Sequence, residues 1–242
     1  MSTRPDTGFD HIVILTGAGI SAESGLATFR DADGLWEKHD PMDIATPEAF
    51  ARDPDLVYRF YNARLDKLGD VQPNDAHRAL ARLESEYPGK VFLVTQNVDD
   101  LHERGGCSQV CHMHGHLRGV LCNYCGSRTL ARGPYDGSDA CHSCEQSGGL
   151  RPDVVWFGEI PYYMDQIERE LEQCSLFVAI GTSGVVYPAA GFVQVARHGG
   201  ARTLEINLEG SEVGSFFDEC RQGLATVEVT RWVDEVLAGA RA

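Results

Sequence analysis

Four short apolar segments constrain the fold of this chain more than any other feature of its sequence. Each is a run of mainly apolar residues that stops at small or polar ones: HIVILTGAG (11–19), KVFLVTQN (90–97), SLFVAIGTS (175–183) and ARTLEINLE (201–209). Such runs are typical of strands that are buried on both faces of a parallel sheet. Helical patterns lie between or after them, at 74–87, 162–174, 188–199 and 232–242. Strands that alternate with helices predict an α/β fold with a doubly wound, Rossmann-like parallel sheet.

The composition narrows the classes of partner. The 242 residues include 36 acidic and 21 basic side chains, so the formal net charge is -15. This sign argues against binding to a phosphate backbone, and we expect no nucleic-acid partner. No apolar stretch approaches the length of about 18 residues that predicts a membrane span, and the N-terminus lacks a signal-peptide pattern. We therefore expect a cytoplasmic protein without membrane attachment, in which the eight cysteines are metal ligands or free thiols.

A glycine-rich turn follows the first predicted strand. Gly17, Gly19 and Ala22 have the spacing that lets a backbone turn tightly and approach a pyrophosphate at the start of the following helix. A plain tight turn gives the same pattern. The acidic residue that would bind a ribose about 20 residues further on is absent from every predicted strand end, so an ordinary dehydrogenase unit is disfavoured.

The other three predicted strands also end in segments suited to binding a nucleotide. These are Gln96, Asn97 and Asp99, then Gly181, Thr182 and Ser183, and finally Asn207, Leu208 and Glu209. Most polar residues at such places merely end strands and cap helices. Ligands of open α/β sheets, however, bind at the carboxyl ends of the strands, where these segments would meet. Their convergence favours a nucleotide site.

Two Cys-x-x-Cys pairs predict a metal site. Cys122 and Cys125 are separated from Cys141 and Cys144 by 15 residues, a spacing found in four-cysteine zinc sites. Four thiolates complete the tetrahedral coordination of zinc and leave no position for a reacting water, so we expect one structural Zn²⁺. His142, inside the second pair, is an alternative ligand. The other four cysteines lack ligand spacing and are interpreted as packing residues: Cys107, Cys111, Cys174 and Cys220.

Two stretches interrupt the alternation of strands and helices. An amphipathic helical segment, PDLVYRFYNARLDKL, lies within residues 38–73, and the cysteine- and glycine-rich stretch 117–151 has little periodicity. We expect the helical insertion 38–73 and the zinc-binding module 117–151 to form a smaller lobe together. The Rossmann-like domain then consists of residues 1–37, 74–116 and 152–242.

Several long segments occur in the order that is found in one enzyme family. They are GAGISAESGLATFRDADGLW (17–36), TQNVDDLHERGG (95–106), HMHG (112–115), the two cysteine pairs, RPDVVWFGE (151–159), GTSGVVYPAAGF (181–192) and EINLE (205–209). Over nearly its whole length the chain thus resembles the sirtuins, which are NAD-dependent protein lysine deacylases. One departure is Leu26-Ala27, where many sirtuins have Ile-Pro. The resemblance implies that NAD is a co-substrate and that the Rossmann-like domain binds it.

The resemblance also assigns roles to residues. His114, which directly precedes Gly115 in HMHG, would be the general base, a role that suits imidazole because its pKa lies near the operating pH. It would act on a ribose hydroxyl, after the acyl-lysine oxygen has attacked the anomeric carbon and nicotinamide has left. His112 and His116 would be structural or surface polar residues. The implied NAD-binding residues are Gly17, Ala18, Gly19, Ser21, Ala22, Phe29, Arg30, Trp36, Gln96, Asn97, Asp99, Gly181, Thr182, Ser183, Asn207, Leu208, Glu209 and Ala225.

A Tyr-x-x-Arg pair indicates the acyl group. Tyr61 and Arg64 face the same way on a predicted helix, and a phenol with a guanidinium can bind a carboxylate at the far end of an acyl chain. Residues at this spacing are usually ordinary surface residues, but sirtuins that remove succinyl or malonyl groups carry the same pair. The resemblance therefore implies removal of succinyl, malonyl and acetyl groups. The protein substrate would bind as an extended peptide at Phe157, Gly158, Glu159 and Val185.

Two other function classes remain open at this point. A mono-ADP-ribosyltransferase would also consume NAD, and the zinc module could belong to an adaptor without enzymatic activity. Sparse basic residues around the cysteine pairs argue against an adaptor for nucleic acid. The expected protein is a monomer whose macromolecular partners are acyl-lysine proteins.

Overall fold

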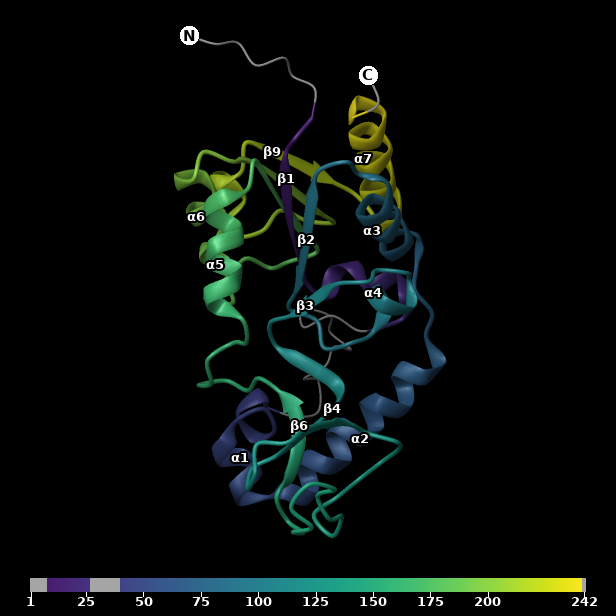
Figure 1. Cartoon of the computed structure of the whole chain (residues 1–242), viewed down its shortest axis with the longest axis vertical. Coiled ribbons are helices and arrows are strands. Elements are labelled where there is room, and N and C mark those ends of the chain that lie inside the picture. The colour runs from purple at the N-terminus through teal and green to yellow at the C-terminus, as the bar shows by residue number, and fades with distance from the viewer. Residues whose placement is uncertain (1–7, 27–39, 241–242) are drawn as a thin grey trace.

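The computed structural model describes residues 8–26 and 40–240, and within them it contains two sheets (Figure 1). The larger sheet has the strand order β3-β2-β1-β7-β8-β9, and every neighbouring pair is parallel. Its strands are β1 (His11–Thr16), β2 (Lys90–Thr95), β3 (Val110–His112), β7 (Leu176–Ile180), β8 (Arg202–Asn207) and β9 (Glu219–Gln222). The four predicted strands and the doubly wound class are confirmed. The short edge strands β3 and β9 were not predicted.

Helices cover both faces of this sheet. The pair α3 (Asp75–Glu86) and α7 (Ala225–Ala240) packs on one face, and the pair α5 (Met164–Gln173) and α6 (Phe192–His198) packs on the other (Figure 1). Alternate residues of β1 pack into two hydrophobic cores, one on each face of the sheet. Ile12 and Ile14 belong to the cluster with α3 and α7, whereas Val13 and Leu15 belong to the cluster with α5 and α6. This is why the run is apolar at every position rather than at every second one.

The smaller sheet is antiparallel and has the order β5-β4-β6. It consists of β4 (Gly115–Cys122), β5 (Arg128–Leu130) and β6 (Leu150–Val154), and it lies near α1 (Pro47–Arg52) and α2 (Pro54–Asp70) at the lower end of Figure 1. One core cluster joins Val57 and Tyr61 of α2 to Leu117 of β4 and to Trp156. The two excursions from the main sheet therefore pack against each other. The predicted domain boundaries stay a prediction.

Two helical details differ from the sequence prediction. The turn after β1 continues into two 3-10 turns, Ala18–Ile20 and Ala22–Ser24, instead of an α-helix, so the dipole of a long helix is not available there. Helix α7 begins at Ala225 instead of Trp232. The remaining short helical elements are α4 (Leu101–Arg104) and the 3-10 turns Pro41–Asp43, Ala189–Gly191 and Gly214–Phe216. Among the residues described, no helix is both long enough and apolar enough to cross a bilayer.

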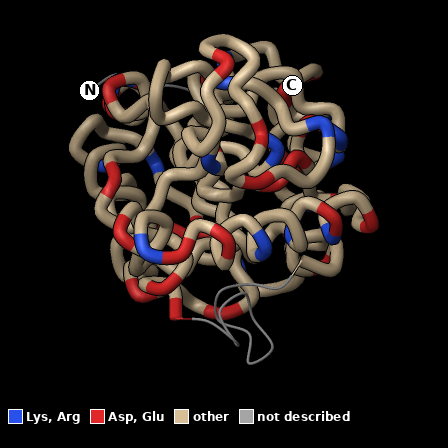
Figure 2. The backbone as a smooth tube through the Cα atoms, turned by 90° about the horizontal axis from the view of Figure 1, so that it is seen from below, with Lys and Arg blue, Asp and Glu red and all other residues tan. Residues whose placement is uncertain are grey.

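Charged residues of both signs are distributed along the backbone in the view of Figure 2. Acidic residues are in the majority, as the 36 to 21 ratio in the sequence requires. The expectation that the protein binds no nucleic acid is compatible with this distribution and stays a prediction.

Candidate active site

The glycine-rich turn after β1 lies directly against the end of β7. The amide of Gly17 donates to the carbonyl oxygen of Ile180 at 3.0 Å, and the amide of Gly19 donates to that of Gly181 at 2.9 Å. A Cβ atom at Gly17 or Gly19 would lie 2.7 Å from a backbone atom of Gly181. Only glycine fits at both positions, because the two backbones leave no room for a side chain. The structure thus places two of the predicted nucleotide-binding segments in contact.

Side chains that follow β2 bind this turn. Nδ2 of Asn97 donates to the carbonyl oxygen of Gly17 at 3.1 Å and to Oγ of Ser21 at 3.2 Å. The Ser21 hydroxyl in turn donates to Oδ2 of Asp99 at 3.1 Å. Burial raises the pKa of Asp99, although hydrogen bonds from the Leu101 amide and from Ser21 oppose the shift. Ser21, Asn97 and Asp99 therefore form one buried network beside the turn.

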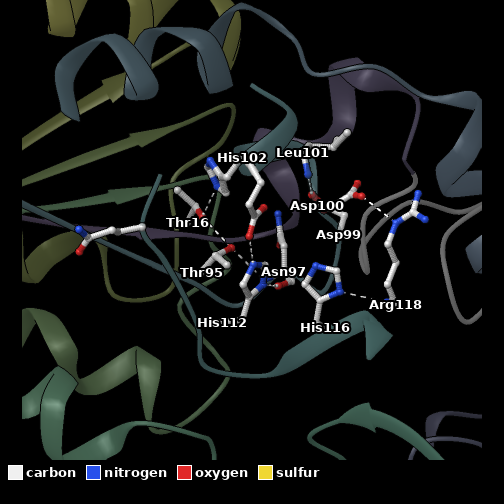
Figure 3. A network of polar contacts seen from close by, with 12 residues as sticks. Thr16, Thr95, Asn97, Asp99, Asp100, Leu101, His102, His112, His116 and Arg118 are labelled. Atoms are coloured by element: carbon white, nitrogen blue, oxygen red, sulfur yellow. Dashed lines mark hydrogen bonds and ion pairs between the residues drawn. The ribbon is translucent and has the colours of Figure 1, made fainter. Parts of the chain in front are cut away.

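Two buried imidazoles complete the network. Nε2 of His77, in α3, lies 3.4 Å from Oγ of Ser21. Nε2 of His102, in α4, lies 3.0 Å from Oγ1 of Thr16 (Figure 3). Burial lowers the pKa of both rings, to about 4 for His77 and well below the ordinary value for His102. Both are neutral at pH 7. The sequence did not reveal them, because a single histidine in a helical segment has no pattern that separates a buried ring from an exposed one.

His114 lies in the turn between β3 and β4. Its Nδ1 is 3.1 Å from the carbonyl oxygen of Gln96. A carbonyl only accepts hydrogen bonds, so Nδ1 carries the proton and Nε2 of the neutral ring carries the lone pair. Burial lowers the pKa of His114. The following Gly115 allows β4 to approach β6 at this point, because a Cβ atom there would lie 2.1 Å from the carbonyl oxygen of Asp153. A neutral ring with an Nε2 lone pair can act as a general base.

His112 and His116 make different contacts (Figure 3). Nδ1 of His112 donates to the carbonyl oxygen of Asn97 at 3.2 Å, and its Nε2 lies 2.6 Å from Oε1 of Glu103. Burial alone would lower the pKa of His112, but the hydrogen bond and charge of Glu103 outweigh burial and raise it. Nδ1 of His116 accepts from the amide of Arg118 at 3.0 Å. His112 is thus one half of an ion pair, a contact that the sequence did not predict.

The ends of β7 and β8 are joined by a hydrogen bond from Nδ2 of Asn207 to the carbonyl oxygen of Thr182 at 2.7 Å. Thr182 is buried, and Leu208 is 64% exposed. The other predicted residues of this group are Ser183, half-buried, Glu209, exposed, and Ala225, half-buried at the start of α7. Of the remaining predicted NAD-binding residues, Ala18 and Ala22 lie in the two 3-10 turns, whereas Phe29, Arg30 and Trp36 lie outside the described residues.

The four cysteines of the two pairs lie together. The Sγ atoms of Cys122 and Cys144 are 3.8 Å apart, as are those of Cys125 and Cys141, and all four lie within 4.8 Å of one another. A tetrahedral ZnS₄ centre with Zn–S bonds of about 2.3 Å has sulfur–sulfur edges of roughly 3.8 Å. The cluster therefore fits one structural zinc ion. His142 is exposed and is not part of the cluster.

The two cysteine pairs have the same backbone turn. The amide of Gly126 donates to the carbonyl oxygen of Cys122 at 2.8 Å, and the amide of Glu145 donates to that of Cys141 at 2.8 Å. Gly126 and Glu145 both have left-handed backbone angles, with φ of 71° and 62°. Such a left-handed residue, four positions after the first cysteine, turns the chain so that both thiols face the same side. Glu145 adopts this conformation without being glycine, at a small cost in backbone strain.

The other four cysteines lie outside this cluster. Cys107 and Cys174 are buried, as the packing interpretation requires, and Cys111 is partly buried. Cys220 is exposed, so the packing interpretation is wrong for that residue. It belongs to the short edge strand β9, which the sequence pattern did not predict.

Glu103, His112 and His116 form a second group of potential metal ligands. Two contacts argue against a metal there. Glu103 is already paired with His112, and Nδ1 of His116 accepts from the Arg118 amide, so the proton of the neutral His116 ring is on Nε2. A ring in that tautomer offers no second lone pair to an ion.

Tyr61 and Arg64 lie on α2 and are close enough for the arginine charge to act on the phenol. Burial raises the pKa of Tyr61 to about 12 and lowers that of Arg64 to about 10. Tyr61 is a phenol and Arg64 a cation at pH 7. Arg64 lines an open cavity of about 350 Å³ on α2, and the other residues around it are Leu56, Arg59, Phe60, Ala63 and Lys67. Tyr61 does not line this cavity and accepts a hydrogen bond from Trp156 instead.

The predicted peptide-binding residues lie in two exposed turns. Phe157 is 49% exposed and Val185 is 55% exposed, which leaves both apolar side chains open to a partner. Gly158 has φ of 90°, a conformation that favours glycine. The carboxylate of Glu159 is bound by Arg151, at 2.7 and 2.9 Å. The Glu159 amide donates to the carbonyl oxygen of Trp156 at 3.0 Å, so a backbone contact of Glu159 with a peptide would use its carbonyl oxygen.

Comparison with known families places the sequence in one of them. The profile of the Sir2 family matches residues 17–188. The chain belongs to the Sir2 family. A relative named NAD-dependent protein deacylase, from Vibrio cholerae serotype O1, is 55% identical over 232 residues, which are 95% of this chain and 94% of the relative. A protein of the same name from Caulobacter vibrioides is 54% identical over 234 residues, which are 96% of this chain and 98% of the relative.

Solved structures of Sir2 proteins have the same fold as this chain. A Sir2 homologue in complex with NAD matches with a TM-score of 0.85 and 40% identity over 95% of this chain and 91% of its own. A Sir2 homologue in complex with ADP-ribose matches with a TM-score of 0.86 and 39% identity, over 96% and 92%. A Sir2 protein bound to an acetylated peptide matches with a TM-score of 0.80 and 25% identity, over 96% and 94%. The family and the fold expected from the sequence are confirmed.

The Sir2 profile covers most of the predicted site. Residues 17–188 include the glycine-rich turn, Tyr61, Arg64, His114 and the four zinc ligands. The segment that ends β8 and the start of α7 lie beyond it. The roles of all these residues stay predictions, although the structure brings the glycine-rich turn, Asn97 and Asp99 together.

Proposed function

We propose that the protein is an NAD-dependent protein-lysine deacylase that removes succinyl, malonyl and acetyl groups. The products would be nicotinamide, the deacylated protein and O-acyl-ADP-ribose. The relatives named NAD-dependent protein deacylase, and the Sir2 structures with NAD and with an acetylated peptide, support this reaction. The observation that carries the proposal is His114, a neutral imidazole whose Nδ1 is fixed by the Gln96 carbonyl and whose Nε2 carries a lone pair.

The residues around the glycine-rich turn support the proposed NAD site. Gly17 and Gly19 let the turn pack directly against Gly181, so two of the segments predicted to bind NAD lie side by side. Asn97 and Asp99 offer an amide and a carboxyl group, which can pair with the carboxamide of nicotinamide. Bound NAD supplies an electrophilic anomeric carbon and the ribose hydroxyls. Nε2 of His114 would accept the proton of one of these hydroxyls and so make it a nucleophile.

The protein substrate would bind as an extended peptide against the turns that hold Phe157 and Val185. Backbone pairing requires little of the substrate sequence, so broad specificity is expected. The exposed apolar side chains at these two positions support this placement.

The preference for acidic acyl groups rests on Tyr61 and Arg64, which lie one turn apart on α2 and close enough for the Arg64 charge to act on the phenol. A phenol and a guanidinium suit an acyl chain that ends in a carboxylate, because both can donate hydrogen bonds to it and the guanidinium adds its charge. Lowering the pKa of Arg64 to about 10 leaves its guanidinium charged at neutral pH.

Replacement of Arg64 by methionine tests this acyl preference. Methionine fills a similar volume but cannot pair with a carboxylate. Loss of a charge-assisted hydrogen bond removes about 1.5–3 kcal/mol. The ratio of kcat/KM for succinyl-lysine over acetyl-lysine peptides should therefore fall roughly tenfold or more. Steady-state assays with matched peptides measure this ratio.

Arg59→Met is the matched control, because Arg59 lines the same cavity but is not part of the Tyr-x-x-Arg pair. It should change the ratio by less than about threefold, as expected for an exposed charge. Equal loss of both activities in Arg64→Met would show that Arg64 supports the fold or NAD binding, and would refute its role toward the acyl carboxylate.

The proposal also includes the location, oligomeric state and partners of the enzyme. The enzyme would be a cytoplasmic monomer that acts on acyl-lysine proteins and binds neither nucleic acid nor membranes. The acidic net charge of -15 supports the lack of a nucleic-acid partner. Light scattering after size-exclusion chromatography tests the monomer.

A further inference from the structure

The hydroxyl of Tyr61 has a defined partner, although it lies deep in the smaller lobe. Nε1 of Trp156 donates to it at 2.9 Å, across 95 residues of sequence. Tyr61 is 7% exposed and Trp156 is 2% exposed, so water does not compete for this contact. An indole N–H can only donate, so the Tyr61 oxygen is the acceptor. The hydroxyl hydrogen of Tyr61 is then directed away from Trp156.

The phenol keeps this hydrogen over the whole physiological pH range. Burial raises the pKa of Tyr61 to about 12, against the opposing effects of Trp156, Arg64 and Arg151. A protonated hydroxyl whose oxygen already accepts from an indole is best used as a donor, and a carboxylate is a strong acceptor for it.

The Trp156 ring is itself held on several sides. The guanidinium of Arg151 lies 3.5 Å from its ring centroid, a cation–π distance. Arg151 is fixed by two hydrogen bonds to Glu159, and Oε2 of Glu159 also accepts from the Trp156 amide at 2.8 Å. The Phe50 ring packs against the indole at a centroid distance of 5.4 Å. These contacts fix the direction of the indole N–H.

We propose that Trp156 is a positioning residue for acyl-group selection, which turns the Tyr61 hydroxyl into a fixed donor for the carboxylate of a succinyl or malonyl group. The proposal rests on the proposed function, because it requires an acyl carboxylate near Tyr61 and Arg64. It also gives the Glu159 carboxylate a role beside the predicted backbone contact with the peptide. Through Arg151, the carboxylate holds the indole.

A double-mutant cycle tests the proposal. Trp156→Phe keeps an aromatic ring but removes the N–H donor. It should lower the succinyl-over-acetyl ratio of kcat/KM roughly threefold to tenfold, mainly through KM for the succinyl peptide, as expected for one hydrogen bond. Tyr61→Phe should lower the same ratio. In the Tyr61→Phe background, Trp156→Phe should lower it no further, because Trp156 acts through Tyr61.

Trp232→Phe is the matched control, since Trp232 is about equally buried but belongs to α7 and packs in the core of the larger sheet. It should leave the ratio unchanged, and thermal melts establish that each variant is folded. An unchanged ratio in Trp156→Phe, or effects of Trp156→Phe and Tyr61→Phe that simply add, would overturn the proposal. Wild-type enzyme that removes acetyl but not succinyl groups would refute the proposed acyl preference and this inference with it. Wild-type enzyme that does remove succinyl groups, together with an unchanged ratio in Trp156→Phe, would refute only the role of Trp156.

Discussion

Replacement of His114 by alanine is expected to lower kcat for deacylation by roughly two to four orders of magnitude, the usual contribution of a positioned general base. The variant loses the Nε2 lone pair that would accept the proton of a ribose hydroxyl. His116→Ala is the control, because this neighbouring imidazole accepts from the Arg118 amide and is not oriented by Gln96. It should lower kcat far less. A similar loss in both variants would contradict the assignment of His114.

The assignment of His114 as general base also predicts how kcat/KM depends on pH. A general base acts in its neutral form, and burial lowers the pKa of His114 below the ordinary 6.5. The neutral form therefore predominates at neutral pH and is lost as the pH falls through the lowered pKa. The acid limb of kcat/KM for wild-type enzyme should have its midpoint below pH 6.5. A midpoint above this value would argue that another group is the base.

Removal of the zinc ion is expected to unfold the smaller sheet. The four ligands lie at the end of β4 and in the loops that connect it to β6, so the ion holds the two loops together. Apparent zinc-binding free energies in zinc-finger peptides are about 10–16 kcal/mol, which equals or exceeds the stability of a typical domain. Cys141→Ser, or treatment with a strong chelator, should release one equivalent of zinc. Amide hydrogen exchange should then accelerate across residues 115–154.

Cys220→Ser provides the comparison for this experiment. Cys220 is exposed and lies outside the cluster of four, so its replacement should change neither the zinc content nor the exchange rates. Protection of β4 and β6 that survives complete removal of zinc would show that the small sheet folds without the ion.

The central strands could be predicted from the sequence because their environment leaves a strong pattern. Strands β1 and β7 are buried on both faces, and each is therefore apolar along its whole length. The edge strands β3 and β9 have three and four residues and pair on one side only, so they leave no such run. Helix α7 was predicted too short because its first turns contain Thr226, Val227 and Val229, which are weak helix formers. Packing of Val229 and Trp232 into the core overrides this preference.

Some features of the candidate site could also be predicted from the sequence, and others could not. The cysteine pairs and the glycine-rich turn depend on short spacings, which a sequence displays directly. The pair of Glu103 with His112 and the contact between Tyr61 and Trp156 depend on how distant segments pack. No spacing in the sequence indicates either contact. The α-helix expected after Gly19 is replaced by 3-10 turns, since a glycine pattern specifies a tight turn but not the conformation of the chain that follows.

NAD-dependent deacylation by this protein is tested most directly by one assay. Purified protein is incubated with NAD and matched succinyl-lysine and acetyl-lysine peptides, and the products are identified by mass spectrometry. Both peptides should lose their acyl group, the succinyl group faster, with one nicotinamide and one O-acyl-ADP-ribose formed per lysine. Turnover of neither peptide, with NAD intact, would contradict it.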